Sequence, residues 1–173
     1  MGDVYEKVKD SRNLFQKLGS KIPGWKGYQE RQERRKADQL MRQTLAEKLA
    51  GQRKRLDVAQ KDLIQAGKIE FVDDIGSAVT QLQTFADRVR LATYGYAGLF
   101  DAVKVNQEEL EQLYAFDMAL FEYVDRLDAA NDRLREAISV GDDVSGVIRI
   151  IQDICREANS TFDEREHALV GAQ

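Results

Sequence analysis

The chain has 173 residues, of which 43% are hydrophobic and 32% charged, and it contains a single proline. This composition suits one helical domain with a sizeable core and argues against an all-β fold, because strand-like runs of Val, Ile and Thr are few. No apolar run approaches the roughly 20 residues that cross a bilayer, and the first residues lack a signal-peptide core, so we expect a cytoplasmic protein.

The charge is unevenly distributed along the chain. The net charge is −4, yet the segment from Lys21 to Arg55 holds 11 Lys and Arg residues against 4 acidic ones. That segment therefore carries +7, and the rest of the chain carries −11. Such asymmetry favours either an anionic partner or charge pairing inside the fold.

The first two predicted helices are separated by a loop rich in glycine. A short, weakly amphipathic helix is expected from Asp3 to Leu18, docked on the rest of the fold or lying on a membrane surface. Residues 19–27 hold three glycines and the only proline, which breaks the helix. A long second helix then runs over residues 28–66, with Leu49, Leu56 and Leu63 recurring every seven residues. Gly51 favours a kink in this helix.

Three further helices follow. Residues 71–94 form the third, and the fourth runs from Asn106 to Val140, where Asn106 and Glu109 have the spacing of a capping box. The fifth begins at residue 142 or 143 and fades into the charged residues 163–166. The fourth helix is apolar on more than one face between Leu110 and Ile138, which indicates that other helices surround it.

These elements predict the fold class and the domain organisation. We expect an all-α fold, namely an up-and-down antiparallel helical bundle of four to five helices with one long second helix. Residues 1–173 are expected to form a single domain. It is divided into an N-terminal helix and Pro/Gly loop (1–27), a long basic helix (28–66) and core helices (71–166).

An up-and-down path places the loops after the first and third helices at the same end of the bundle. Aromatic residues from both loops and basic residues from the start of the second helix would meet there. This composition is typical of a partner-binding surface. An alternative is that the aromatic rings plug the bundle while the arginines pair with nearby carboxylates. The candidate partner-binding residues are Trp25, Tyr28, Arg31, Arg34, Arg35, Tyr94, Tyr96 and Phe100.

Residue patterns for catalysis or metal binding are weak. Glu164 and His167 have the Glu-x-x-His spacing of di-iron bundles, but those sites need two such pairs, and the chain has one histidine. Cys155, the only cysteine, lies in an apolar run that favours a buried thiol over a nucleophile. Asp117 and Asn131 are expected to be hydrogen-bonded polar groups near the apolar face. We therefore predict no catalytic residue, no metal and no cofactor.

Two stretches, Ile22–Asp38 and Tyr94–Val103, resemble signatures of uncharacterised small helical proteins of bacteria. The resemblance covers under a fifth of the chain. It implies a helical fold, and it implies neither an activity nor a catalytic residue.

The functional prediction is a non-enzymatic helical interaction or scaffold module that binds a protein partner through the basic, aromatic end. Self-association through the leucine stripe of the long helix is expected as a further mode of assembly. The alternative is a peripheral binder of anionic surfaces, with membrane headgroups ahead of nucleic acid, because the sequence pI of about 5.2 is low for a nucleic-acid-binding domain. No small-molecule substrate is expected.

Overall fold

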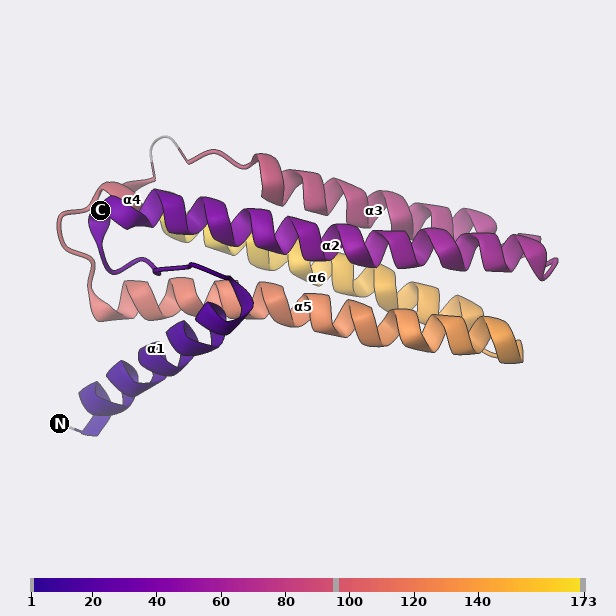
Figure 1. The fold of residues 1–173 in the computed structure, drawn as a ribbon, viewed down its shortest axis with the longest axis horizontal. Helices are drawn as coiled ribbons and strands as arrows, with labels where there is room; N and C mark the ends of the chain where they lie inside the picture. Colours follow the sequence, from indigo (N-terminus) through magenta and orange to yellow (C-terminus); the bar gives the residue numbers. More distant parts are fainter. Residues whose placement is uncertain (1, 95–96, 172–173) are drawn as a thin grey trace. The chain divides into compact units, whose positions relative to one another are not determined.

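The computed structural model describes residues 2–94 and 97–171, with the side chains of the first helix from residue 11 onward. These residues form helices and no strand, which confirms the all-α class. The α-helices are α1 (Gly2–Lys21), α2 (Arg34–Gln65), α3 (Val72–Leu91), α4 (Gly98–Asp101), α5 (Gln107–Val140) and α6 (Val144–Gly171), as drawn in Figure 1. The six helices described exceed the predicted four to five because α4, a single turn, lies in a segment expected to be a loop.

Several helix boundaries differ from the prediction. The long helix begins at Arg34 rather than Tyr28, after a 3-10 turn over Arg31–Glu33. The reason is tertiary: the Tyr28 backbone N–H donates to the hydroxyl of Tyr114, and the Tyr28 carbonyl accepts from the Arg34 side chain. The helix continues through Gly51 without interruption.

The ends of two other helices also differ from the prediction, while the start of α5 agrees with it. Helix α3 ends at Leu91, three residues earlier than expected, while α6 continues to Gly171, well past the predicted end at residue 166. The capping box that opens α5 is confirmed, because the Glu109 N–H donates to Asn106 Oδ1 at 2.8 Å. The Asn106 N–H donates in return to Glu109 Oε2 at 3.3 Å.

The chain divides into two compact units. Unit 1 comprises Met1–Thr44, Ala92–Phe121 and Ser160–Gln173, and unit 2 comprises Leu45–Leu91 and Glu122–Asn159. Helices α2, α5 and α6 contribute residues to both units. The single-domain assignment stays a prediction.

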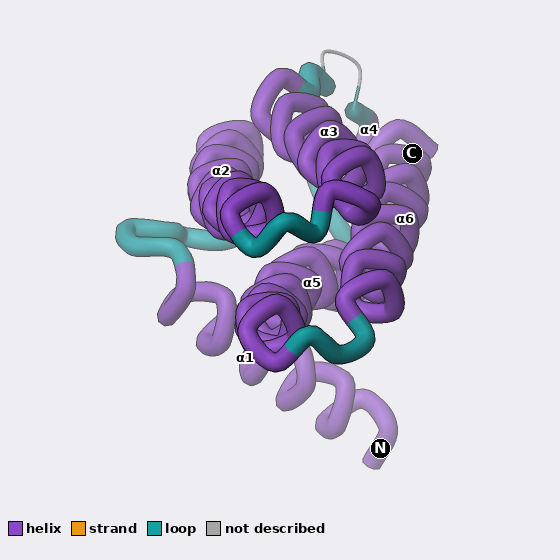
Figure 2. Tube along the Cα trace, turned by 90° about the vertical axis from the view of Figure 1, so that its right-hand side faces the viewer, coloured by secondary structure: helices purple, strands orange, loops and turns teal. Residues whose placement is uncertain are grey.

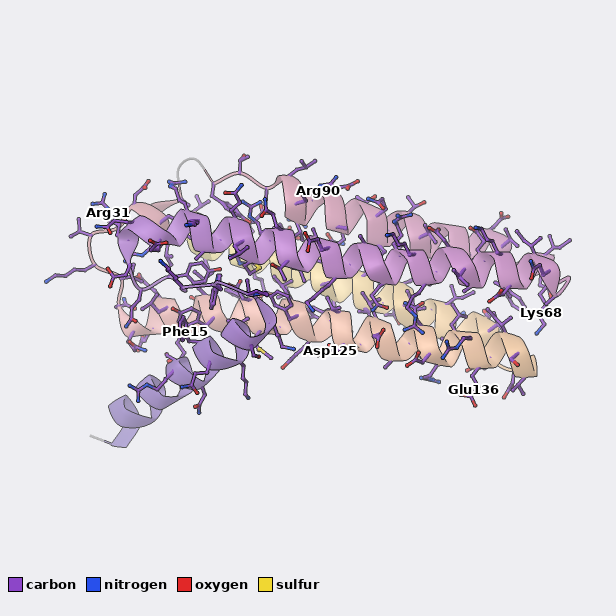
Figure 3. All side chains as sticks on the ribbon, viewed as in Figure 1. Phe15, Arg31, Lys68, Arg90, Asp125 and Glu136 are labelled. Atoms are coloured by element: carbon purple, nitrogen blue, oxygen red, sulfur yellow. The ribbon has the colours of Figure 1, made fainter. Side chains whose placement is uncertain are left out.

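Unit 1 contains α1, α4 and the terminal portions of α2, α5 and α6. Helix α1 crosses the first half of α5 at an angle, which Figure 2 shows from a second side. Phe15 of α1 lies beside α5 in Figure 3, and its ring centroid is 6.0 Å from that of Tyr114. Leu18 and Ile22 are fully buried, so the end of α1 packs into unit 1.

In unit 2, the four helical stretches, which belong to α2, α3, α5 and α6, contact one another through their side chains. Between α2 and α5, Gln52 donates to Asp128 and accepts from Asn131. Between α3 and α6, Arg88 donates to Asn159. The leucine stripe expected to pair with a partner helix, Leu49, Leu56 and Leu63, is fully buried within this unit. Its core also includes Ile75, Leu82, Phe85, Leu127, Leu134, Val147, Ile151 and Ile154.

Candidate functional site

The aromatic residues predicted to bind a partner form part of the core of unit 1. Trp25, Tyr28, Tyr94 and Phe100 are each at most 9% exposed. The Trp25 ring stands edge-on to that of Tyr28 at 5.3 Å, and the Tyr28 ring lies 6.3 Å from that of Phe100. The structure therefore brings these four rings together, with their faces covered. Tyr96 lies outside the described residues.

Two residues outside the predicted set complete this aromatic cluster. Phe15 stacks on Trp25 with ring centroids 5.7 Å apart, and Tyr114 stacks on Tyr28 at 5.6 Å. Trp25 also donates its indole N–H to the carbonyl of Ala37 at 2.9 Å, which satisfies its one polar group inside the core. The surroundings of Trp25 are thus those of a structural tryptophan.

Arg34 connects the two loops that the sequence placed at one end. It is 3% exposed, its Nε–H donates to the carbonyl of Tyr28 at 2.8 Å, and one terminal nitrogen donates to the carbonyls of Leu99 and Ala102. Burial lowers its pKa from the ordinary arginine value, with nearby Arg31 as the second cause. A cation that donates to three carbonyls holds the 28–33 and 99–102 segments together.

The other two candidate arginines are exposed. Arg35 donates to the carbonyl of Tyr94 at 2.7 Å and pairs with Asp101 at 3.0 Å, and its guanidinium lies 5.7 Å from the centre of the Phe100 ring. Arg31, labelled in Figure 3, is exposed and has no ion pair with any described residue. Of the predicted set, these two present their charge at the surface.

The hydroxyls of Tyr28 and Tyr94 belong to a network of buried charges around Arg165. The sequence predicted that Asp117 is a hydrogen-bonded polar group, which is confirmed, but Arg165, Asp38 and Arg42 were not predicted. Arg165 of α6 is fully buried. Its Nε–H donates to Asp117 at 2.6 Å, and a terminal nitrogen donates to Asp38 at 2.6 Å and to the Tyr28 hydroxyl at 3.1 Å. The Tyr28 hydroxyl donates to the second oxygen of Asp117 at 2.5 Å.

The network closes with a second cation and a second tyrosine. Arg42 donates from Nε to Asp38 at 2.8 Å, and Arg165 donates from its other terminal nitrogen to the Tyr94 hydroxyl at 3.3 Å. Two arginines thus face two aspartates, Asp38 and Asp117, so the formal charges of the buried network cancel. Buried charges are tolerated in proteins when they are paired and hydrogen-bonded in this way.

The pKa shifts follow from burial and from these pairings. Burial alone would lower the pKa of Arg165, but the carboxylates of Asp117 and Asp38 raise it well above its usual value, so the side chain stays charged. Burial raises the pKa of Tyr28, and the adjacent Asp117 carboxylate raises it further. Burial likewise raises the pKa of Tyr94 to about 12. Both phenols are therefore protonated near neutral pH, and the Tyr28 hydroxyl donates to Asp117 while the Tyr94 hydroxyl accepts from Arg165.

A signal for Arg165 was present in the sequence. The apolar row of the last helix continues beyond its expected end, since Ala158, Phe162 and Leu169 are all buried and follow helical spacing. Arg165 occupies the position of that row between Phe162 and Leu169. Its neighbours 163, 164 and 166 are acidic, which made the segment look like a solvated tail.

The remaining candidates for chemistry lie apart from this network. His167 is exposed and shares an open surface hollow with Glu164 and Glu109. Cys155 is buried in unit 2, and burial raises the pKa of its thiol to about 11. Among the described residues, no three His, Cys, Asp or Glu side chains gather as a metal site would require. None of the helices described is both long enough and apolar enough to cross a membrane.

Comparisons with protein-family models, with curated proteins and with solved structures each found no match to this chain.

Proposed function

We propose that the chain is a non-enzymatic interaction module whose exposed cations near the start of α2 bind an acidic segment of a partner protein. The proposal rests on one observation: the predicted residues divide into buried aromatic rings and exposed cations. The aromatic rings are buried, while Arg31 and its neighbours Lys26 and Lys36 are exposed. The surface chemistry of this region is therefore cationic.

The buried interactions support the proposal by fixing the backbone that carries these cations. Arg34 binds three carbonyls, and Trp25 is anchored to Ala37. Lys26 and Arg31 thus project from a loop held at several points, which reduces the ordering cost of binding. Glu30 and Glu33 lie in the same stretch, so the expected binding is moderate and sensitive to salt.

The architecture proposed for this role is the up-and-down antiparallel bundle expected from the sequence, in a cytoplasmic protein. The side-by-side contacts of α2, α3, α5 and α6 within unit 2 support it. Self-association also stays a proposal, although the leucine stripe is buried within unit 2 and a dimer would need another surface. Light scattering over a range of concentrations measures it directly.

The test compares two variants with the same net charge. One is Arg31→Glu with Lys36→Glu, and the matched control is Lys17→Glu with Lys61→Glu, since these two lysines are also exposed. Fluorescence anisotropy measures binding of an oligoglutamate peptide at low and high salt. We expect the first variant to lose binding while the control retains it. Equal losses in both variants would show a diffuse charge effect and contradict the proposal.

A second arm of the experiment addresses membrane lipid as the anionic partner. Burial of Trp25 argues against it, because interfacial tryptophans insert their ring among the headgroups. Flotation with vesicles containing phosphatidylserine is expected to leave the protein unbound. Salt-sensitive binding to these vesicles, without binding to the peptide, would replace the proposed partner with a lipid surface.

A further inference from the structure

A partly enclosed pocket lies between α1 and the first turns of α5 in unit 1. Its volume is about 290 Å³, close to the lower limit of small-molecule sites. The loop before α2 contributes Gln29 to its wall. The two helices contribute Ser11, Arg12 and Phe15 from α1 and Gln107, Leu110 and Tyr114 from α5.

The polar groups of this pocket are mostly donors. Among the residues described, Arg12 is the one ionised side chain that lines the pocket, and none of those lining it is acidic. The Tyr114 hydroxyl accepts the N–H of Tyr28 at 3.2 Å, which leaves its own proton for an acceptor. Gln29 and Gln107 add two amides. One cation with several neutral donors matches a ligand that carries a single negative charge.

Ser11 supplies an independent observation. It is 5% exposed, it lines the pocket, and its Oγ has no hydrogen-bond partner among the described residues. Buried hydroxyl groups are nearly always hydrogen-bonded, so this exception needs a reason. A ligand oxygen in the pocket would give the hydroxyl the acceptor that the protein does not provide.

The rest of the wall is apolar. Phe15, Leu110 and the ring of Tyr114 form it, and Phe15 is held in place by stacking on Trp25 at 5.7 Å. An apolar cavity of about 150 Å³ holds one benzene molecule, so this pocket has room for a ring and a short acid chain. Phosphate esters carry a second charge near neutral pH, for which the described part of the wall offers no second cation.

We propose that this pocket binds a small amphipathic carboxylate, with the carboxylate at Arg12 and the apolar part against Phe15 and Leu110. The binding is non-covalent and involves no reaction. It is independent of the partner surface proposed above, because Arg12 lies on α1 and the exposed cations of that surface lie on the loop before α2 and on the start of α2.

The experiment uses phenylpropanoate as the probe and phenylpropanamide as its uncharged analogue. Trp25, the only tryptophan, reports binding through its fluorescence because its ring contacts Phe15 and Tyr114, which line the pocket. Calorimetry gives the affinity independently. We expect the acid to bind at least about tenfold more tightly than the amide.

Variants then assign the binding to the pocket. Arg12→Gln should weaken the acid about tenfold and leave the amide unchanged, while Lys17→Gln, which removes another exposed cation of α1, should change neither. Ser11→Ala should weaken the acid several-fold without lowering the thermal stability of the unliganded protein, because the lost hydroxyl has no hydrogen-bond partner among the residues described. Thermal unfolding of each variant verifies that it is folded.

Three results would overturn the proposal. The first is equal affinity for acid and amide, the second is an unchanged acid affinity in Arg12→Gln, and the third is no binding of the acid at about 1 mM. A Ser11→Ala variant that is less stable and binds the acid normally would show that the hydroxyl serves the fold alone, which also contradicts its assigned role.

Discussion

Replacement of Arg165 by methionine is the most informative single change. Methionine fills much of the volume of arginine, so the substitution removes the charge and the donors while leaving a modest cavity. It would leave Asp117 and Asp38 buried beside a single remaining cation, Arg42. The variant therefore tests whether the buried network is held by its charge balance.

The expected cost follows from the contacts that are lost. Arg165 makes two ion pairs at 2.6 Å and further bonds to two tyrosine hydroxyls, all in full burial. Removing one partner of a buried ion pair typically costs 3–5 kcal/mol, so we expect a loss of about 4 kcal/mol. That is a large part of the roughly 5–15 kcal/mol that stabilises a folded domain.

Urea unfolding followed by circular dichroism measures this loss. With an m-value of about 2 kcal/mol per molar urea, the midpoint should fall by about 2 M. The control is Arg156→Met on the same helix, because Arg156 is exposed and pairs with Asp153 one turn away. Exposed pairs contribute about 0–1 kcal/mol, so the control midpoint should barely move.

A second substitution separates charge from packing. Asp117→Asn added to Arg165→Met restores neutrality among Asp38, Arg42 and the substituted positions, so the double variant should lose less stability than the sum of the single variants. Lower pH should also favour the single variant relative to wild type, because burial raises the pKa of Asp117 and the guanidinium that opposes this shift is absent from the variant. Additive losses that are independent of pH would refute the charge-balance explanation and leave only a packing effect.

Three further predictions concern the surroundings of this network and the one cysteine. Gly27→Ala should cost about 2 kcal/mol or more in urea unfolding, because φ is +74° and a Cβ would meet the ring of Phe15 and the hydroxyl of Tyr114. Gly24→Ala, with φ of +78° and open space, should cost about half as much. Raising the pH from 10 to 12 should remove about 2 kcal/mol of stability, because burial raises the pKa of Tyr94 from 10.0 to about 12 and the folded state resists its ionisation. The fall of the urea midpoint over this pH range should be smaller in Tyr94→Phe, and the part that remains comes from other buried phenols such as Tyr28, whose pKa is also raised. Cys155, whose thiol pKa is raised to about 11 by burial, should react with dithionitrobenzoate at about pH 8 only as fast as the protein opens, as measured by absorbance.

The helical elements could be predicted because each is encoded by its own residues. The spacing of apolar residues between Leu110 and Ile138 predicted α5, and its residues Leu113, Leu120 and Leu134 are buried. The capping box at Asn106 and Glu109 is a local hydrogen-bond pattern, and it forms as expected. Such features depend on neighbours three or four residues away, which a sequence displays directly.

The start of α2 could not be predicted in this way. Residues 28–33 have helix-compatible side chains, yet the backbone N–H of Tyr28 binds Tyr114, which lies 86 positions further along the chain. The burial of Trp25 is likewise decided by a distant surface, because Phe15, Tyr28 and Tyr114 all cover it. An aromatic loop has the same composition whether it faces solvent or plugs a core, so the sequence left both interpretations open.

The buried charges could not be predicted one at a time, but together they show a pattern that a sequence reveals. Each of the three central residues is the exception in its own segment: Asp38 lies in the basic stretch, Asp117 in the helix that is apolar on more than one face, and Arg165 among three acidic residues. Taken singly, Asp38 and Arg165 would be assigned to the surface, because the burial of one charge is unfavourable, whereas Asp117 was expected to be a hydrogen-bonded group near the apolar face. Their burial is favourable only together, and the pairing joins α2, α5 and α6. A charged residue can differ in character from its segment and still occupy a position in the apolar row of a helix. Such a residue is better interpreted as one member of a buried ion pair, and its partner should be sought on another helix.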